Sequence, residues 1–395
     1  MRLLHIEDRF HPEMGYQINY FARFHAPGTE VVILTSVSTR LWGQELNLQD
    51  LQELDRDFES KYKVKIHRLP AALDRRTKSN IWMKGLRRAI REIAPDIVFL
   101  HTLESYSALR LLSWGRLLYR YPFFSDTHTL LNQFNKSLAF RLHLFWIRKV
   151  VRRRLIRSQT RVFATVPENA AILRDHYGLP PEQILYSPIG TDLASFRRDE
   201  RAGAALRKEL AIPASETLVL YTGKLNARKN PHLLLDAMRP HSEELASPMH
   251  LCFVGEADSA YLKARFHEEA MGKNLHIHRY PAVPSNTLYR WYSMADFAVF
   301  PDENTLSALD AQACGLPVIM QSDTTNRERL AKGGLCYEKG NLQDLAAKVL
   351  RLAASPGERA TLGKGGEAYV RSKYDYRKIV RQMEADLGLH KEPKL

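Results

Sequence analysis

Charged side chains recur in this sequence directly after short apolar runs. Lys224 follows the run LVLYTG, and Arg228 and Lys229 come shortly afterwards. Asp302 follows FAVFP in the same way, and Asp310 stands eight residues further along. Cations on a loop can hold a diphosphate and stabilise one that departs, while two carboxylates can hold the hydroxyls of a nucleotide sugar. These residue types favour a site for a phosphorylated sugar.

The helix expected after Asp302 offers a second kind of phosphate ligand. It begins near Thr305 and closes at Cys314-Gly315, before the next strand starts at Pro317. The first N–H groups of a helix have no partner within it, and with the helix dipole they attract phosphate. The candidate substrate-binding residues of this segment are Glu303, Asn304, Thr305, Leu306 and Ser307.

Two histidines lie where strands of the first half are expected to end. His101 follows DIVFL and His128 follows PFFSDT. Because parallel α/β proteins bind ligands at the carboxyl ends of their strands, both are candidates, with a structural role as the alternative. Gly15 lies between the first strand and the first helix, followed by Tyr16 and Gln17. A lone glycine there requires no more than a turn.

Short β-like runs alternate with helical patterns along nearly the whole chain, which predicts an α/β fold with parallel sheets. The strands expected in the first half are 2–6, 30–35, 63–69, 96–100, 122–126, 161–166 and 183–187. After the polar stretch 197–216 we expect strands at 218–223, 250–255, 275–280, 297–300 and 317–320, and helices from about 341 to 388. Two Rossmann-like halves joined near residue 195 are the simplest architecture.

The order of these motifs resembles the family 4 glycosyltransferases. The family pattern is a Glu, seven residues, a second Glu and A-x-A-x-G-x-P-V-I, to which DAQACGLPVI (310–319) is similar. LVLYTGKLNARKN (218–230) resembles the family's G-R-x4-K-G element. YSPIGTDLASF (186–196) resembles its P-N-G-V-D-x-x-x-F turn. The likeness covers nearly the whole chain in the right order.

The resemblance implies the GT-B fold, in which two Rossmann-like parallel-sheet domains face each other across a cleft. It implies an acceptor-binding domain over 1–195 and a nucleotide-sugar-binding domain over 196–373. A C-terminal helix in 374–395 is expected to cross back and pack on the first domain.

The resemblance also implies roles for single residues. Lys224 and Lys229 stabilise the leaving diphosphate, Asp310 holds the ribose, and His128 holds the sugar. The expected catalytic residues are His128, Lys224, Lys229 and Asp302. The expected substrate-binding residues are Gly15, Tyr16, Gln17, His101, Arg228, Glu303, Asn304, Thr305, Leu306, Ser307 and Asp310.

Four positions depart from the family pattern. Both acids of the Glu pair are Asp here, and Glu303 serves as the first acid only if the spacing is one residue shorter. Lys224 stands where the family has Arg, which replaces bidentate geometry by a point charge. Ile189 replaces the Asn of the turn, so we expect only a hinge role for Gly190 and Asp192.

The net charge of +14 comes from one contiguous region. Residues 75–161 contain nineteen Lys or Arg and four acidic residues, and the remainder of the chain is nearly neutral. The stretch 80–93 carries apolar residues at helical spacing, namely Trp82, Leu86, Ile90 and Ile93. The stretch 136–161 has nine Lys or Arg, no acid, and an apolar stripe of Leu144, Ile147, Val151 and Leu155.

Basic amphipathic helices that contain Trp and Phe can lie in the interface of an anionic membrane. We therefore expect 80–93 and 136–161 to bind such a surface. A solvated basic face and nucleic acid binding are the alternatives. Nucleic acid is not expected as a partner, because the sequence lacks zinc-finger spacing, an RNA-recognition signature and a convincing helix–turn–helix.

The remaining sequence features narrow the class of protein. The balance of 45% hydrophobic and 26% charged residues is that of a globular protein, and no apolar run approaches the ~20 residues of a membrane span. The N-terminus has no signal-peptide pattern, and three cysteines without metal-ligand spacing fit a reducing cytoplasm. Asp55 and Asp57 form an Asp-x-Asp within a polar helical pattern, which does not favour a metal site. We expect no metal, no cofactor, and a location at the inner face of the membrane.

These observations predict a metal-independent glycosyltransferase of the hexosyltransferase type. It would move a sugar from a nucleoside diphosphate sugar to a hydroxyl acceptor with retention of configuration. The expected acceptor is a membrane lipid or lipid-linked glycan in cell-surface polysaccharide or glycolipid synthesis. The alternatives are a nucleotide-sugar epimerase or a phosphorylase of the same architecture, or a non-catalytic protein that binds sugar nucleotides or glycans.

Overall fold

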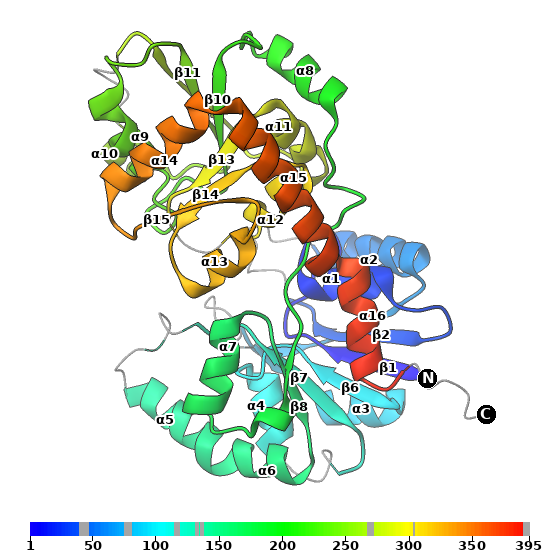
Figure 1. Ribbon diagram of the computed structural model, residues 1–395. Coiled ribbons are helices and arrows are strands. Elements are labelled where there is room, and N and C mark those ends of the chain that lie inside the picture. The colour runs from blue at the N-terminus through cyan, green and yellow to red at the C-terminus, as the bar shows by residue number, and fades with distance from the viewer. Residues whose placement is uncertain are drawn as a thin grey trace, which may run out of the picture. The chain divides into compact units, whose positions relative to one another are not determined.

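The chain forms two compact units, each built on one parallel sheet with helices packed against it (Figure 1). The computed structural model describes residues 1–38, 47–74, 81–113, 119–130, 134, 138–266, 272–302 and 305–389. The first unit comprises Met1–Ile189 and Tyr376–Leu395, and the second comprises Gly190–Asp375. This architecture confirms the α/β fold with two Rossmann-like parallel sheets.

The first unit has a seven-stranded parallel sheet in the order β3-β2-β1-β6-β7-β8-β9. The strands are β1 (Arg2–Ile6), β2 (Glu30–Ser36), β3 (Lys65–Leu69), β6 (Ile97–Leu100), β7 (Phe123–Thr127), β8 (Arg161–Ala164) and β9 (Ile184–Tyr186). All of them lie in runs that the sequence predicts as strands. Their side chains are mostly buried, as expected of a parallel sheet that is covered on both faces.

The helices of the first unit cover this sheet. They include α1 (Gln17–Phe24), α2 (Leu48–Tyr62), α3 (Leu86–Ile93), α4 (Tyr106–Ser113), α7 (Pro167–Ala171), and the short turns Ile172–His176 and Pro181–Gln183. A longer helical segment consists of α5 (Leu138–Trp146), a π-helical turn (Ile147–Val151) and α6 (Arg152–Arg157).

The stretch 80–93 is not one amphipathic helix, contrary to its apolar spacing. Ile81–Met83 form strand β5, which pairs antiparallel with β4 (Ala71–Asp74). Gly85 then has a φ of +74°, a left-handed conformation that suits glycine, and helix α3 begins only at Leu86. The hairpin places Trp82 on the surface, while Leu86, Ile90 and Ile93 are buried.

The second unit has a six-stranded parallel sheet in the order β12-β11-β10-β13-β14-β15. The strands are β10 (Thr217–Thr222), β11 (Met249–Val254), β12 (Leu275–Tyr280), β13 (Phe297–Phe300), β14 (Val318–Gln321) and β15 (Gly334–Tyr337). Only β15 is absent from the sequence prediction. The run GLCY is short and lies at the sheet edge, where its four residues are mostly half-buried.

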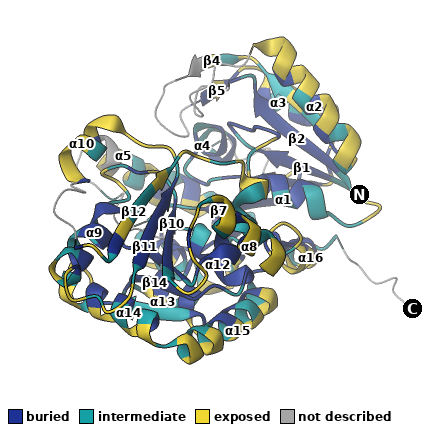
Figure 2. Ribbon diagram, turned by 90° about the horizontal axis from the view of Figure 1, so that it is seen from above, coloured by how far each residue is buried: buried dark blue, intermediate teal, exposed yellow. Residues whose placement is uncertain are grey.

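The helices of the second unit follow the strands in alternation. They are α8 (Glu200–Glu209), α9 (His232–Met238), α10 (Ser259–Arg265), α11 (Leu288–Met294), α12 (Ser307–Ala313), α13 (Thr324–Leu330), α14 (Leu342–Ala354) and α15 (Pro356–Lys373), with short turns at Arg239–His241 and Ser285–Thr287. The central strands of both sheets are buried, and exposed residues gather on the outer sides of helices such as α2 and α15 (Figure 2).

Helix α16 (Tyr376–Asp386) belongs to the first unit, although it follows the whole second unit in sequence. Its residues Tyr376 and Val380 share one apolar cluster with Phe21 and Phe99. The Tyr376 ring stacks on Tyr20 at 4.0 Å between centroids, and Glu384 accepts a hydrogen bond from the Ala26 amide at 2.9 Å. These contacts explain why the chain returns to the first sheet.

Candidate active site

Each sheet has one position where the strand order reverses, and several candidate residues follow the strands on either side of it. In the first unit this position lies between β1 and β6, and in the second it lies between β10 and β13. At such a point the loops after the two central strands turn in opposite directions and leave a crevice at the carboxyl ends of the strands. The loop with Gly15 follows β1, and His101 follows β6. Lys224 follows β10, and Asp302 follows β13.

Lys224 stands at the end of β10 in an exposed ion pair. Its Nζ lies 3.1 Å from Oε2 of Glu256, which follows β11. The backbones of these two loops are close together, since a Cβ added at Gly255 would come within 1.9 Å of the Gly223 carbonyl oxygen. The close approach places the Lys224 and Glu256 loops side by side.

The loop from Gly223 to Pro231 is organised by two asparagines. The side-chain oxygen of Asn226 accepts hydrogen bonds from the amides of Arg228 and Lys229 at 3.2 and 3.1 Å. Asn230 has a positive φ of 43° and donates from its side chain to Asp302 at 2.8 Å. The cationic loop after β10 is therefore tied directly to the acidic loop after β13.

Asp302 accepts two amide hydrogen bonds. The side-chain amide of Asn230 donates to one carboxylate oxygen, and that of Gln321 at the end of β14 donates to the other at 3.1 Å. These two bonds orient the Asp302 carboxylate at the ends of β13 and β14. Glu303 and Asn304, two predicted substrate-binding residues, lie outside the described residues.

The start of helix α12 is held by side chains of two elements. Thr305 Oγ1 accepts a bond from the amide of Ser307 at 3.3 Å, and Arg329 of α13 donates to the Thr305 carbonyl at 3.3 Å. Leu306 is the N-terminal cap residue of the helix. The helix start is expected to bind phosphate through its free amides, but the amide of Ser307 already has an acceptor within the protein.

Asp310 lies in the first turn of α12 and receives a hydrogen bond from Thr191 at 2.5 Å. Burial raises its pKa to about 7, although the bond from Thr191 acts in the opposite direction. Thr191 belongs to the turn for which the sequence predicts a hinge. In the structure this turn also contacts a candidate site residue. Thr191 orients the carboxyl group of Asp310, which is expected to bind the ribose.

A chain of four polar side chains runs along the first sheet to His128. The rings of His5 and His101 meet through Nδ1 and Nε2 at 2.9 Å, and His101 Nδ1 lies 3.2 Å from Oδ2 of Asp126. His128 Nε2 lies 3.6 Å from the same oxygen. The amide of Thr102 donates to the other oxygen of Asp126 at 2.6 Å. Because an ionised Asp126 can only accept, a neutral His101 carries its proton on Nδ1 and accepts from His5.

The electrostatics of this chain favour a charged His128. Burial by itself raises the pKa of Asp126, but the attraction of His128 and the bond from His101 outweigh it and hold that pKa well below its usual range. Burial likewise lowers the pKa of His128, and the charge of Asp126 outweighs it, so the net shift is upward. Burial lowers the pKa of His5 well below its ordinary value. His5 therefore stays neutral, while His128, about a third exposed, favours the protonated form.

The loop after β1 supplies a further polar group. Gly15 and Tyr16 are exposed, and Tyr16 is the residue that precedes helix α1. Gln17 is 7% exposed, and within the described part of the chain neither polar atom of its amide has a hydrogen-bond partner. A buried amide without partners is costly, so Gln17 is a candidate for contact with a substrate or a bound water.

Metal ligands do not gather in the part of the chain that the structure describes, which shows no group of three or more His, Cys, Asp or Glu able to hold an ion. Asp55 of the Asp-x-Asp sequence is bound by Arg68 through two hydrogen bonds of 2.5 and 2.7 Å. That ion pair gives Asp55 a structural role.

Both halves of the chain match glycosyltransferase families. Residues 18–195 match glycosyltransferase family 4, and residues 204–369 match the glycosyl transferases of group 1. The two matches meet at the boundary between the two sheets. The chain belongs to the family 4 glycosyltransferases.

Curated relatives of this family 4 chain carry the name D-inositol 3-phosphate glycosyltransferase. The protein of Segniliparus rotundus is 29% identical over 224 residues, which is 54% of this chain and 49% of the relative. That of Streptomyces bingchenggensis is 30% identical over 53% of this chain and 49% of the relative. The chain thus spans about half the length of the curated relatives that it matches.

Solved structures of low identity share the complete fold. Anabaena HepE in complex with UDP matches with a TM-score of 0.72 at 15% identity, over 99% of this chain and 100% of that chain. Sucrose-phosphate synthase of Thermosynechococcus elongatus matches with a TM-score of 0.70 at 18% identity, over 98% of both chains. At such identities the likeness supports the GT-B fold of this family 4 member.

Sequence reasoning missed the residues that hold the candidates in place. Asn230, Gln321 and Thr191 contact the predicted acids, and Asp126 and Glu256 pair with the predicted cations. For Asp126 a signal was present, because it stands two residues before His128 in the same strand end. For Gln321 and Glu256 the sequence offers only their position at the carboxyl ends of strands.

Proposed function

We propose that this family 4 chain transfers a sugar from a nucleoside diphosphate sugar to a hydroxyl acceptor with retention of configuration. The observation that carries the proposal is the Asn230–Asp302 hydrogen bond. It joins a loop with Lys224, Arg228 and Lys229 to an acidic loop at the point where the second sheet reverses its strand order. A site with cations on one side and carboxylates on the other suits a diphosphate that is attached to a sugar.

The second unit would bind the nucleotide. Lys224 and Lys229 neutralise the diphosphate as it departs, and fixed charges of this kind stabilise a leaving group without a metal ion. Lys224 would exchange its ion pair with Glu256 for the phosphate, because an exposed pair contributes little energy. Asp302 would accept hydroxyls of the sugar, and Asp310 those of the ribose.

The first unit would hold the transferred sugar and the acceptor. A protonated His128 would donate a hydrogen bond to a sugar hydroxyl. Gln17 offers an amide without a partner in the described chain, and the loop of Gly15 and Tyr16 lies next to it. We propose a hexose as the sugar.

The acceptor that we propose is a lipid or a lipid-linked glycan at an anionic membrane surface. Exposed basic residues follow one another along α5, the π-helical turn and α6, namely Arg141, Arg148, Lys149, Arg152, Arg153 and Arg157. Each basic side chain near an anionic surface contributes about 1 kcal/mol. In the described residues, none of the helices has the length and apolarity to cross a membrane. Attachment to the surface is therefore the form of membrane contact that we propose.

Replacement of Lys229 or Lys224 by Ala tests the diphosphate role. We expect kcat to fall by about 10²–10³, the usual effect of removing one group that stabilises a developing charge. The measurement is release of the nucleoside diphosphate from a panel of donors, in the presence of a lipid-linked acceptor. Lys208→Ala is the control, since Lys208 is an exposed lysine of the same unit on α8.

Three results would argue against the proposal. Turnover that is nearly unchanged in both lysine variants contradicts the diphosphate role. Activity that is lost with EDTA and restored by manganese contradicts a mechanism that relies on the two lysines alone. Donor binding without release of nucleotide under any acceptor condition would favour a binding protein.

A further inference from the structure

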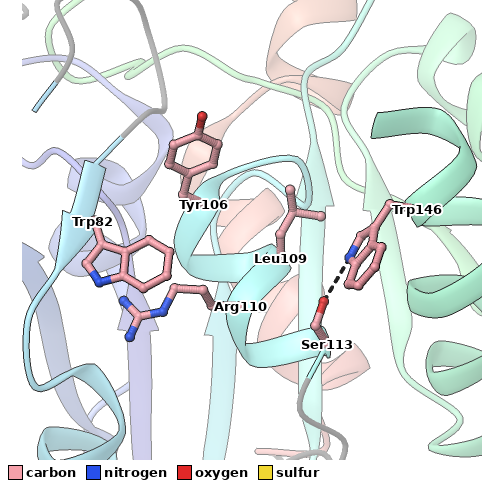
Figure 3. Close-up of a pocket in the computed structure, with 6 residues that line it drawn as sticks. All are labelled: Trp82, Tyr106, Leu109, Arg110, Ser113 and Trp146. Atoms are coloured by element: carbon pink, nitrogen blue, oxygen red, sulfur yellow. Dashed lines mark hydrogen bonds between the residues drawn. The ribbon is translucent and has the colours of Figure 1, made fainter. Parts of the chain in front are cut away.

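The first unit has an open hollow of about 280 Å³ on its surface (Figure 3). Its lining residues are Trp82 of β5, Tyr106, Leu109, Arg110 and Ser113 of α4, and Trp146 at the end of α5. The volume lies near the lower end of the ~300–1,000 Å³ range of small-molecule sites. None of these residues belongs to the candidate active site, so the hollow requires its own explanation.

Two polar groups of the lining are engaged with the protein itself. The indole N–H of Trp146 donates to Ser113 Oγ at 2.9 Å, and Arg110 donates to the carbonyl of Met83 at 2.9 Å. The Arg110 guanidinium lies over the Trp82 ring, 3.9 Å from its centroid, as Figure 3 shows. The rest of the lining is largely apolar and includes the two indoles and the side chain of Leu109.

Large apolar side chains beside the hollow are left exposed. Trp82 and Trp146 are 42% and 45% exposed, although both are of a size that a folded protein normally buries. On α5, Leu142 and Phe145 are each 59% exposed. An exposed apolar patch of this kind marks an interaction site, and indoles favour the boundary between water and lipid.

The charge around this surface indicates which apolar partner it fits. Arg141, Arg148 and Lys149 are exposed on the helical segment that carries Trp146, and the stretch 136–161 contains no acid. A partner with a hydrocarbon chain and a negatively charged head group complements both features. A neutral apolar ligand would leave the basic residues without a function.

We propose that the hollow binds one hydrocarbon chain of an anionic, phosphate-bearing lipid. The identification of that lipid with the acceptor rests on the proposed function. The chain lies between Trp82 and Trp146, and the phosphate faces the exposed basic residues of α5 and the turn that follows it. Bound in this way, one lipid is held by the first unit and partly withdrawn from the bilayer.

Monoalkyl phosphates of increasing chain length, below their micelle concentrations, test this site directly. We expect inorganic and butyl phosphate to leave the tryptophan fluorescence unchanged, and octyl and decyl phosphate to bind. Affinity rises by about fourfold for each added methylene until the hollow is filled, and then levels off. Trp82→Ala and Trp146→Ala each lose at least tenfold in affinity for decyl phosphate, measured by calorimetry.

Leu48→Ala is the matched control, because Leu48 is a 60% exposed apolar residue of the same unit on α2. It should bind decyl phosphate like the unaltered protein. Leu109→Phe is a second variant, in which the larger side chain fills the hollow. It should lower the affinity for decyl phosphate and leave thermal stability nearly unchanged. Three results would overturn the proposal. They are equal affinity in all four variants, an affinity that rises with chain length and never levels off, and displacement of decyl phosphate by free hexoses.

The test separates this site from the proposed activity. If decyl phosphate binds as expected but no acceptor is glycosylated, the hollow is a lipid site and the transferase proposal fails. If transfer to a lipid acceptor occurs with the same KM for that acceptor in Trp146→Ala and Leu48→Ala, the hollow does not serve the acceptor. If Trp146→Ala raises the KM for the acceptor at least tenfold and leaves the KM for the donor unchanged, the result supports both the lipid site and the transferase proposal.

Discussion

The Asp126 carboxylate is the residue on which the polar chain of the first unit depends. It accepts bonds from Thr102 and His101 and lies 3.6 Å from His128 Nε2. A buried carboxylate with these partners stays ionised, and its charge favours protonation of His128. Asp126 is thus a positioning residue, which sets the orientation and charge of the histidine proposed to meet the sugar.

Asp126→Asn should lower the pKa of His128, because the opposite charge beside the imidazole is lost. Proton chemical shifts of His128, followed against pH, measure the effect. Because folding raises the pKa of His128, protonation of this histidine stabilises the folded state. The His128–Asp126 pair stabilises the fold fully below His128's ordinary pKa of about 6.5, and this contribution is lost as pH rises through the folded-state value.

The control for this change is Asp175→Asn. Asp175 is an exposed carboxylate of the same unit, paired with Arg174, so its replacement alters the net charge equally but outside the polar chain. The same His128 pKa in both variants would contradict the assigned role of Asp126. A pKa that falls only in Asp126→Asn supports it.

At the scale of elements, the ends of β10 and β11 depend on a close approach between two backbones. The space between Gly223 and Gly255 admits no side chain at Gly255, since its Cβ would lie 1.9 Å from a carbonyl oxygen. This approach is what allows Leu225 to bond the carbonyl of Glu256 at 2.8 Å, next to the Lys224–Glu256 ion pair. Packing of the two loops and placement of the cation are therefore linked.

Gly255→Ala should destabilise the second unit by about 1–3 kcal/mol, because one loop must move to admit the methyl group. Urea unfolding followed by circular dichroism gives the shift in midpoint. Gly357→Ala is the matched control: Gly357 lies in helix α15 with no atom within 4 Å of an added Cβ, so alanine there should be neutral or slightly stabilising. Equal midpoints for the two variants would show that the loops adapt without cost.

The helical segment from Leu138 to Arg157 shows what periodicity can and cannot predict. The stripe expected from the sequence is real, but it faces inward: Ile147, Val151 and Leu155 are buried in the core, and Leu144 packs against them. The side chains available to a membrane are others, among them Leu142 and Phe145. Spacing identifies an apolar face, whereas the neighbouring elements decide whether that face is covered.

At the scale of the whole molecule, the excess positive charge belongs to the first unit. Residues 75–161 lie entirely within it, and the remainder of the chain is close to neutral. Such an asymmetric distribution creates a field that attracts an anionic surface to one unit, with a range set by salt. The second unit, proposed to bind the donor, contributes little to this attraction.

Vesicle flotation tests the surface attraction. The triple variant with Arg141, Lys149 and Arg153 replaced by Ala should bind vesicles rich in anionic lipid about a hundredfold more weakly, at about 1 kcal/mol per basic side chain. Binding of the unaltered protein should weaken as salt rises above about 0.15 M, where the Debye length falls below ~8 Å. The variant should keep its affinity for a nucleotide sugar.

A variant with Lys61, Lys208 and Lys263 replaced by Ala is the control, since these exposed lysines lie outside the basic region. It removes the same charge and should bind vesicles nearly as well as the unaltered protein. Flotation that depends neither on the anionic lipid content nor on the salt concentration would rule out an electrostatic surface contact.

The sequence alone was sufficient for most of the strands, the two parallel sheets and the order of the candidate loops. Buried parallel strands are short apolar runs, and the loops that follow them are marked by charged residues, so both signals are local. The hairpin of β4 and β5 and the edge strand β15 were missed because their runs are short, and 80–93 was misread because a strand and a helix share its apolar spacing.

Partnership between distant residues was decided only by the tertiary structure. Asp302 meets Asn230 and Gln321, Asp310 meets Thr191, and Asp126 meets His101, in each case across separate strands or loops. The hollow between Trp82 and Trp146 is likewise assembled from three elements. The reason is physical: a side chain's type and spacing are properties of its own segment, whereas its burial, charge state and partners are set by the segments that folding brings next to it.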